Sequence, residues 1–312
     1  MVWLLCIVVL LLGILIWAAR LCYRLVFYNL NNKEQDVYVV PPGEQYEKVA
    51  DIMLAQIDEL NHLPYEQVYI SARDGIKLAA RYYHFKDNAP IQIQFHGYRG
   101  NGIREFSGGF KIAKELGFNA LVVDERAHGK SGGHTISFGI LERYDCVDWV
   151  SYICKRFGRE VPIILSGVSM GAATVLMASE LNFEGNVVAI TADCPYSSPG
   201  AIIRKVCRGM KLPAWLLYPL VVLGALIFGR FALWKSSALN AVKNTNIPIF
   251  LVHGEDDRFV PCDMSREIDS ACRGPHMFLT IPDAGHGISY YVDTFRYHDA
   301  LIQFFRNCNL IL

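Results

Sequence analysis

The sequence predicts an α/β fold with a mostly parallel, doubly wound sheet, and three observations support that expectation. Short apolar strands alternate with helical segments from about residue 66 onward, which is the pattern of a sheet covered by helices on both faces. An Ile-rich strand at 161–166 runs directly into a helix that begins near residue 170. About 250 residues suit one domain of this kind.

The turn between that strand and that helix is Gly167-Val168-Ser169-Met170-Gly171, a G-x-S-x-G pattern. Small residues two positions before and after the serine let the backbone pass close to itself. The turn lifts the Ser169 hydroxyl above the sheet edge, at the positive end of the helix dipole. We therefore interpret Ser169 as a nucleophile, which needs a base to take its proton and an acid to orient that base.

Two later segments supply a candidate acid and a candidate base. A buried strand at 247–253 opens into an acidic loop that contains Asp256 and Asp257. A last strand at 276–282 ends in a loop with His286 between two glycines. Side chains at the ends of parallel strands gather at one edge of the sheet, and the order Ser, Asp, His follows this chain.

From about residue 66 to 307 the chain resembles the α/β-hydrolase superfamily. Val252–Pro261 is similar to its H-G-x-x-D-x-x-V-P loop, and Phe95–Asn101 is similar to its oxyanion loop. Asp124–Ser131 looks like its D-x-R-x-H-G-x-S loop. Within the superfamily the chain looks closest to membrane-anchored bacterial hydrolases of the serine aminopeptidase-like and lysophospholipase-like type.

The resemblance implies a fold and a set of site residues. The implied fold is the α/β-hydrolase fold with a helical cap. The implied catalytic residues are Ser169, Asp257 and His286. The backbone N–H groups of Tyr98 and Met170 are implied as the oxyanion hole, which stabilises the charge that develops on the carbonyl oxygen.

Several other polar residues receive secondary interpretations. The loop alignment makes Asp256 a loop residue, whereas Asp193, at the end of another strand, is an alternative acid because some relatives take it from there. His96, Arg126 and His128 are expected to brace neighbouring loops.

The first residues of the chain predict a membrane anchor. Met1 to Ala19 contain no charged side chain, and about 19 helical residues nearly span the hydrocarbon core of a bilayer. Arg20 and Tyr23 follow, a basic and aromatic mixture typical of the interface. Because the small residues of a cleavage site are weak here, we favour an uncleaved anchor over a signal peptide.

The orientation of the anchor follows from charge and cysteine usage. Positive side chains lie only after the span, which favours a cytoplasmic catalytic domain. Nine cysteines without regular spacing or a CxxC motif fit a reducing compartment. We therefore expect a single-pass membrane protein whose catalytic domain faces the cytoplasm.

Three regions are expected: an anchor at 1–30, a linker and lead-in helix at 31–65, and the hydrolase domain at 66–312. Residues 67–70 and 77–83 flank Arg73-Asp74-Gly75, which predicts a hairpin. An insertion at about 196–241 has an apolar core, in which Pro213 and Pro219 are expected to break the helix. We expect this insertion to cap the active site, and nothing in the span to reach the catalytic loops beyond residue 90.

These features predict a membrane-anchored serine hydrolase that cleaves an ester, possibly a lipid or acyl ester, through an acyl-enzyme on Ser169. An aminopeptidase or amidase of the same fold is one alternative. The insertion holds no Asp or Glu to bind a free amine, which favours esters. A catalytically silent membrane scaffold is the other alternative. No cofactor or metal is implied, and a formal net charge of zero gives no support for a nucleic-acid partner.

Overall fold

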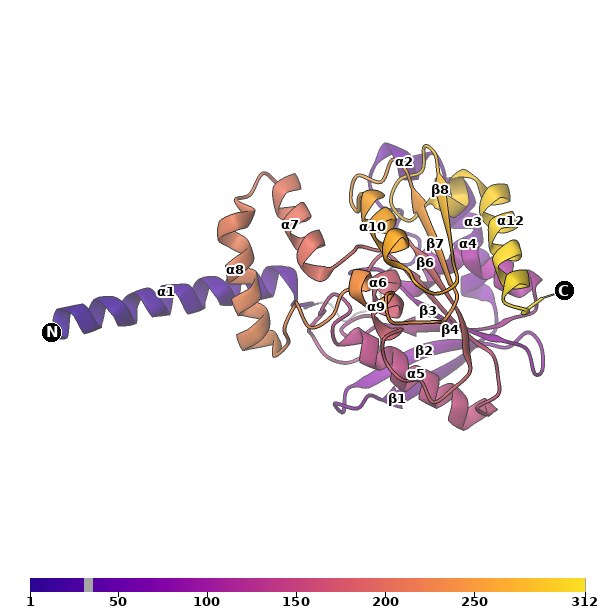
Figure 1. The fold of residues 1–312 in the computed structure, drawn as a ribbon, viewed down its shortest axis with the longest axis horizontal. Helices are drawn as coiled ribbons and strands as arrows, with labels where there is room; N and C mark the ends of the chain where they lie inside the picture. The colour runs from indigo at the N-terminus through magenta and orange to yellow at the C-terminus, as the bar shows by residue number, and fades with distance from the viewer. Residues whose placement is uncertain (31–35, 312) are drawn as a thin grey trace.

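A mixed sheet forms the centre of the protein, and Figure 1 shows it with helices on both sides. The computed structural model describes residues 1–30 and 36–311, so the start of the predicted linker and the final residue lie outside the described residues. The sheet has eight strands in the order β1-β2-β4-β3-β5-β6-β7-β8. The strands are β1 (Glu66–Ser71), β2 (Lys77–Tyr83), β3 (Ile91–Phe95), β4 (Asn119–Asp124), β5 (Ile163–Val168), β6 (Val187–Asp193), β7 (Ile249–Gly254) and β8 (His276–Ile281).

The pairing of the strands confirms the predicted doubly wound topology. Strands β3 to β8 run parallel to one another, whereas β1 pairs antiparallel with β2, and β2 pairs antiparallel with β4. The predicted hairpin joins β1 to β2, with Gly75 at a φ of +85°. That positive φ is the reason a glycine occupies the turn.

Helices cover both faces of the sheet because each strand alternates its side chains between two cores. In β4, Leu121 and Val123 join the cluster around Trp149 of α5 (Glu142–Phe157), whereas Ala120 and Val122 join the cluster around Phe110 of α4 (Gly102–Glu115). The helices of the domain are α2 (Glu44–Glu47), α3 (Ala50–His62), α4 (Gly102–Glu115), α5 (Glu142–Phe157), α6 (Met170–Ala178), α10 (Asp263–Ala271), α11 (Ser289–Val292) and α12 (Thr294–Asn307).

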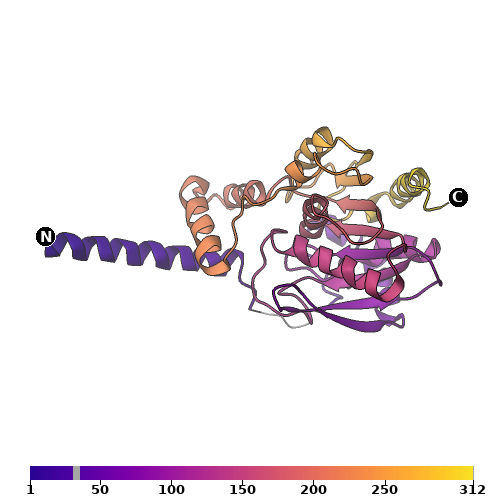
Figure 2. The same ribbon diagram turned by 60° about the horizontal axis from the view of Figure 1, so that its bottom comes forward.

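The first helix, α1 (Val2–Val26), projects away from the domain in both ribbon views (Figures 1 and 2). It is long and apolar enough to cross a membrane by length and composition, a test that signal sequences also pass. Its last turns pack against the domain, because Ala19, Tyr23 and the C-cap Phe27 are buried, and Tyr23 and Phe27 belong to a third apolar cluster. The end of the predicted anchor is therefore part of the packed protein.

The insertion at 196–241 is helical, as expected. It contains α7 (Pro199–Gly209), α8 (Ala214–Gly224), a π-helical turn η1 (Ala225–Gly229) and α9 (Ala238–Ala241). Pro213 precedes α8, but the expectation that Pro219 also breaks the helix is wrong, since Pro219 lies inside α8. The other backbone hydrogen bonds of α8 and its packing against α1 hold the helix across that proline.

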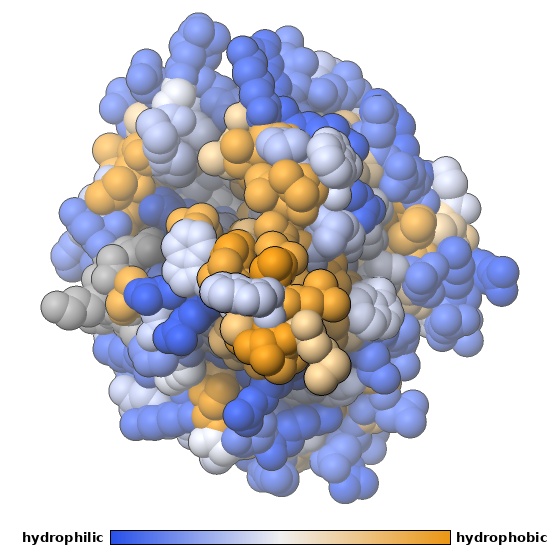
Figure 3. Space-filling model, turned by 90° about the vertical axis from the view of Figure 1, so that its left-hand side faces the viewer, coloured by the Kyte–Doolittle hydropathy of each residue, from blue (hydrophilic) through white to orange (hydrophobic). Residues whose placement is uncertain are grey.

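The insertion packs along α1, with α8 crossing the anchor near its end (Figures 1 and 2). Gly224 lies so close to the anchor that a Cβ there would stand 2.5 Å from the Ala19 carbonyl oxygen. Viewed along α1, apolar side chains gather around the anchor within a mostly polar face (Figure 3). The exposed apolar residues of the insertion include Leu212, Trp215 and Leu216.

Candidate active site

Ser169 stands in a tight turn between β5 and α6, as the sequence predicts. Its φ of +54° and ψ of −110° are strained for a residue with a side chain. The two flanking glycines are required by close packing. A Cβ on Gly167 would lie 2.3 Å from the Gly171 backbone, and a Cβ on Gly171 would lie 1.9 Å from the Phe95 carbonyl oxygen.

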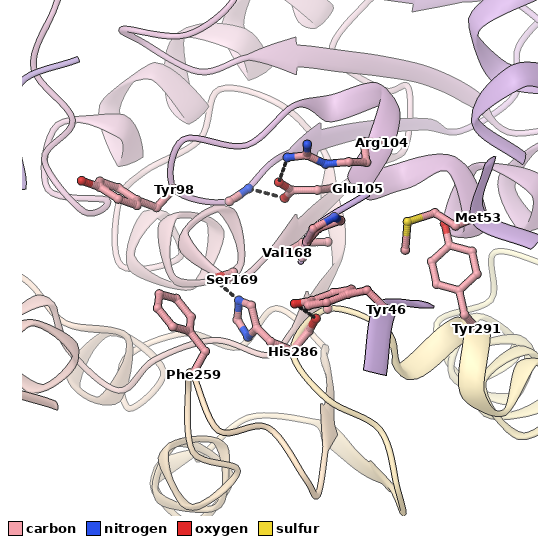
Figure 4. A pocket seen from close by; sticks show the side chains of 13 residues that line it. Tyr46, Met53, Tyr98, Arg104, Glu105, Val168, Ser169, Phe259, His286 and Tyr291 are labelled. Atoms are coloured by element: carbon pink, nitrogen blue, oxygen red, sulfur yellow. Dashed lines mark hydrogen bonds and ion pairs between the residues drawn. The ribbon is translucent and has the colours of Figure 1, made fainter. Parts of the chain in front are cut away.

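The structure brings the three predicted catalytic side chains into one hydrogen-bonded chain. His286 Nε2 lies 2.9 Å from Ser169 Oγ, and His286 Nδ1 lies 2.6 Å from Asp257 Oδ2. Asp257 Oδ1 accepts hydrogen bonds from the backbone N–H groups of Phe259 and Val260, both at 2.8 Å. The second carboxylate oxygen is thus left to orient the imidazole (Figure 4 shows the Ser169–His286 contact).

The environment of Asp257 keeps this carboxylate ionised. Burial would raise its pKa, but hydrogen bonds from His253 and His286 outweigh burial and hold the pKa well below the ordinary value. His253 is itself buried and fixed, with Nδ1 2.6 Å from Ser265 Oγ and Nε2 2.8 Å from the Val260 carbonyl oxygen. A permanent negative charge therefore faces His286 Nδ1.

The other two acidic candidates occupy different positions. Asp256 is exposed. Asp193 is buried, one of its oxygens has no hydrogen-bond partner among the described residues, and burial raises its pKa to about 7. The hydrogen bond to His286 comes from Asp257, so the geometry favours Asp257 as the acid.

One group of side chains among the described residues has the donor atoms of a metal site. Cys194, Asp257 and His286 place their ligand atoms within 4.8 Å of one another. Asp257 and His286 already hydrogen bond to each other, and Cys194 is a buried thiol whose pKa is raised by burial. Two of the three donor side chains, Asp257 and His286, therefore already belong to the hydrogen-bonded chain that leads to Ser169.

The predicted oxyanion donors, Tyr98 and Met170, belong to two segments that adjoin Ser169. Met170 is the first residue of α6, so its N–H is one of the helix donors without an intrahelical partner. Tyr98 belongs to the loop after β3. A Cβ on the preceding Gly97 would lie 3.3 Å from Ser169 Cβ, which places this loop directly against the serine.

Two histidines brace this loop, as the sequence predicts. His128 Nε2 accepts the Arg99 N–H at 3.0 Å, and His96 Nε2 accepts the Glu125 N–H at 3.1 Å. Burial lowers the pKa of His128 to about 4 and holds that of His96 well below its usual value, so both rings are neutral acceptors. Arg126 binds both oxygens of the Asp145 carboxylate and fixes the next loop.

A pocket of about 150 Å³ opens in front of Ser169 and His286 (Figure 4). None of the described residues of the insertion lines it, and the expectation that 196–241 caps the active site stays a prediction. Lys205 of α7 donates from Nζ to the carbonyl oxygens of Arg258 and Phe259 at the edge of the pocket, whereas α8 packs against α1. The lining residues are Pro41, Tyr46, Met53, Gly97, Tyr98, Arg104, Glu105, Val168, Ser169, Phe259, His286, Gly287 and Tyr291.

Part of this lining comes from the lead-in region, which the sequence suggested only as a linker and helix. Tyr46 of α2 donates a hydrogen bond from its hydroxyl to the His286 carbonyl oxygen at 2.9 Å. Pro41 and Met53 complete the same wall. A tyrosine three residues after the Pro41-Pro42-Gly43 break was the available signal, but the local pattern does not reveal which distant loop it meets.

Glu105 is a second feature that the sequence did not single out. This buried carboxylate in the first turn of α4 accepts the Gly97 N–H at 2.5 Å, and burial raises its pKa. Its other oxygen lies 3.9 Å from the Arg104 guanidinium (Figure 4). The pocket therefore has one carboxylate in its wall, but this carboxylate already accepts the Gly97 N–H and pairs with Arg104.

Several solved structures have a fold similar to that of this chain. An esterase of Pyrococcus furiosus, Pf2001, superimposes with a TM-score of 0.62 and 24% identity, covering 88% of this chain and 99% of its own. The α/β hydrolase GrgF of Penicillium superimposes with a TM-score of 0.62 and 17% identity, covering 78% and 99%. The chain has the α/β-hydrolase fold. A third structure of this fold is the Est1E protein of Butyrivibrio proteoclasticus with bound ferulic acid, at a TM-score of 0.59 and 21% identity, covering 78% and 100%.

Two relatives found by sequence are also similar to this chain. The uncharacterized YqkD protein of Bacillus subtilis is 27% identical over 196 residues, which is 62% of this chain and 64% of that protein. The human protein ABHD12B is 28% identical over 204 residues, 61% of this chain and 52% of its own. The chain thus spans less than two thirds of either relative, and no family model matches it.

Proposed function

We propose that this protein is a membrane-anchored serine hydrolase that cleaves a carboxylic ester through an acyl-enzyme on Ser169. The observation that carries the proposal is the continuous hydrogen-bonded chain from Ser169 Oγ through His286 to the ionised Asp257. In an α/β-hydrolase fold this arrangement converts a weak hydroxyl nucleophile into one that attacks a carbonyl carbon.

The proposed reaction has two halves. Ser169 Oγ attacks the ester carbonyl while His286 takes the hydroxyl proton, and the Tyr98 and Met170 amides stabilise the resulting oxyanion. His286 then gives the proton to the departing alcohol. Water, deprotonated by His286, attacks the acyl-enzyme and releases the acid. The Asp257 charge stabilises the imidazolium that forms in each half.

The pocket favours a short acyl group. Its volume of about 150 Å³ equals that of a protein cavity that binds a benzene-sized molecule. Val168, Met53 and Phe259 supply apolar walls. Because Glu105 is engaged by Gly97 and Arg104, no uncommitted carboxylate in this wall awaits the amine of a peptide, and an ester is favoured over an aminopeptidase substrate.

The membrane placement rests on α1 and the insertion together. The part of α1 before the buried Ala19 rises about 25 Å, which is slightly less than the hydrocarbon thickness. α8 packs against α1, and Trp215 (80% exposed) and Leu216 (49% exposed) lie exposed in its first turn. We propose that these residues sit in the membrane interface, where tryptophan is favoured. We also propose that the catalytic domain faces the cytoplasm and that the substrate is a small-molecule or lipid-like ester whose acyl group is short.

Hydrolysis of p-nitrophenyl esters of increasing chain length by the full-length protein in detergent tests the proposal. We expect turnover to be highest for short acyl groups and to fall by several orders of magnitude in Ser169→Ala, which stays folded. Amino-acid p-nitroanilides serve as the matched amide series. A folded wild-type protein that cleaves neither series would support the silent-scaffold alternative, and preference for the anilides would support the peptidase.

A further inference from the structure

The end of the membrane helix is hydrogen bonded to the oxyanion loop. The last carbonyl groups of an α-helix lack intrahelical partners and need donors from elsewhere. At the end of α1, the Tyr98 hydroxyl donates to the Val26 carbonyl at 2.8 Å. The Arg99 guanidinium donates to the Leu25 and Tyr28 carbonyls, both at 3.2 Å. Its positive charge also suits the negative end of the helix dipole.

Packing holds the same end of α1 rigidly in the domain. The Tyr98 ring stacks on Phe138 with centroids 5.0 Å apart, and Phe27 meets the other side of this cluster by an edge contact to Phe138 at 5.8 Å. The Phe27 carbonyl accepts the Ile136 N–H at 2.8 Å. Met170, which carries the other oxyanion amide, belongs to the same buried cluster.

The oxyanion loop is thus held from three sides. Glu105 fixes the Gly97 N–H, His128 fixes the Arg99 N–H, and the end of α1 fixes the Tyr98 hydroxyl. Arg99 has a φ of +52°, a strained value that its surroundings must maintain. Of the three supports, only α1 belongs to the segment that leads into the membrane.

We propose that the last turn of α1 is a positioning element of the active site, which acts through the Tyr98 hydroxyl to set the Tyr98 amide in the oxyanion hole. The inference rests on the proposed function. Oxyanion donors act over a narrow distance range, and a misplacement of about 1 Å costs roughly a hundredfold in rate. Loss of one of three supports is expected to cost about tenfold.

Tyr98→Phe in the full-length protein tests this role, because it removes the hydroxyl and retains the backbone amide and the ring that stacks on Phe138. The matched control is Tyr23→Phe. The Tyr23 hydroxyl also anchors α1, at 2.7 Å from Thr135 Oγ1, but does not touch the oxyanion loop. For a short-chain ester we expect Tyr98→Phe to lower kcat about tenfold with KM little changed. Tyr23→Phe should retain wild-type kcat.

A trifluoromethyl ketone, which forms a tetrahedral adduct with the serine, separates positioning from folding. Its inhibition constant should weaken in Tyr98→Phe by the same factor as kcat, because both depend on the oxyanion hole. Wild-type kcat and inhibition constant in Tyr98→Phe would overturn the proposal. Equal losses in both variants would also overturn it, since they would reflect a loosened helix rather than the tether.

Amide hydrogen exchange of a peptide containing residues 97–100 keeps this test separate from the proposed function. If the wild type hydrolyses no ester, the proposed function fails, but the tether is still measurable. Faster exchange of this peptide in Tyr98→Phe, and not in Tyr23→Phe, would support the tether. Exchange that matches the wild type would overturn it.

Discussion

Asp257 illustrates how much of the site depends on two oxygens of one carboxylate. One oxygen accepts two backbone N–H groups, which fixes the side chain, and the other orients His286. The adjacent Asp256 is exposed and has no such geometry. The H-G-x-x-D spacing from His253 was the sequence signal that separated the two, and the hydrogen bonds now give it a physical basis.

Asp257→Asn should lower kcat by roughly 10³–10⁴, because an amide in this place no longer holds the productive histidine tautomer. Asp256→Asn is the matched control and should stay near wild type. Steady-state hydrolysis of a short-chain ester at pH 8 measures both. A crippled Asp256→Asn together with an active Asp257→Asn would contradict the assignment.

For Asp193 we predict an effect on the pH dependence of stability rather than on catalysis. Burial raises its pKa from about 3.9 in the unfolded chain to about 7 in the folded protein, so the folded state binds more protons between these values. The stability of the wild type should therefore fall as pH rises from about 4 to about 7. The Asp193→Asn variant has no titrating group at this position. The Tm of the variant relative to that of the wild type should therefore rise as pH increases from about 4 to about 7, and the variant should stay active. A Tm difference that is independent of pH would contradict this account.

At the scale of elements, α4 supports the oxyanion loop through Glu105. Glu105→Gln retains an oxygen that accepts the Gly97 N–H, whereas Glu105→Ala removes the acceptor. We expect Glu105→Ala to lower kcat up to about a hundredfold and Glu105→Gln to lower it only a few-fold. Comparison of the two in the same ester assay isolates the hydrogen bond from the charge. Equal losses of kcat in both variants would show that the negative charge of Glu105, and not its hydrogen bond to the Gly97 N–H, supports the loop.

The sequence predicted the elements more successfully than their contacts. The strands themselves, the hairpin at Gly75 and the turn at Ser169 follow from local patterns, since apolar runs, glycines and turn residues act over a few positions. The place of α8 did not follow. Its partner is α1, about 200 residues earlier in the chain, and two apolar helices contain no local signal that they pair. The same limit hid Tyr46 and Glu105, whose roles depend on loops distant in sequence.

At the scale of the whole molecule, the anchor and the domain share a core. The expectation that nothing in the span reaches the catalytic loops is wrong, since Leu25 and Val26 of α1 accept hydrogen bonds from the oxyanion loop. The predicted boundary at residue 30 lies just before the polar, charged segment that begins at Lys33. The packed boundary lies nearer Ala19, where the helix becomes buried.

Two truncations distinguish these boundaries. Removal of residues 1–17 leaves Ala19, Tyr23 and Phe27 in place, so Tm should change little. Removal of residues 1–30 opens the cluster around Phe138 and should lower Tm by about 10 °C, by analogy with deletion of a buried aromatic side chain. Differential scanning fluorimetry in the same detergent measures both. Equal Tm values would mean that the end of α1 is not part of the core.

The central claim is that Ser169 is the nucleophile of a working triad, and covalent labelling tests it most directly. The full-length protein is treated with a fluorophosphonate, which phosphonylates activated serines, and the labelled residue is identified by peptide mass spectrometry. We predict a single adduct on Ser169, absent from Ser169→Ala and much slower to form in Asp257→Asn. An adduct on another residue, or no adduct on a folded protein that hydrolyses esters, would contradict the claim.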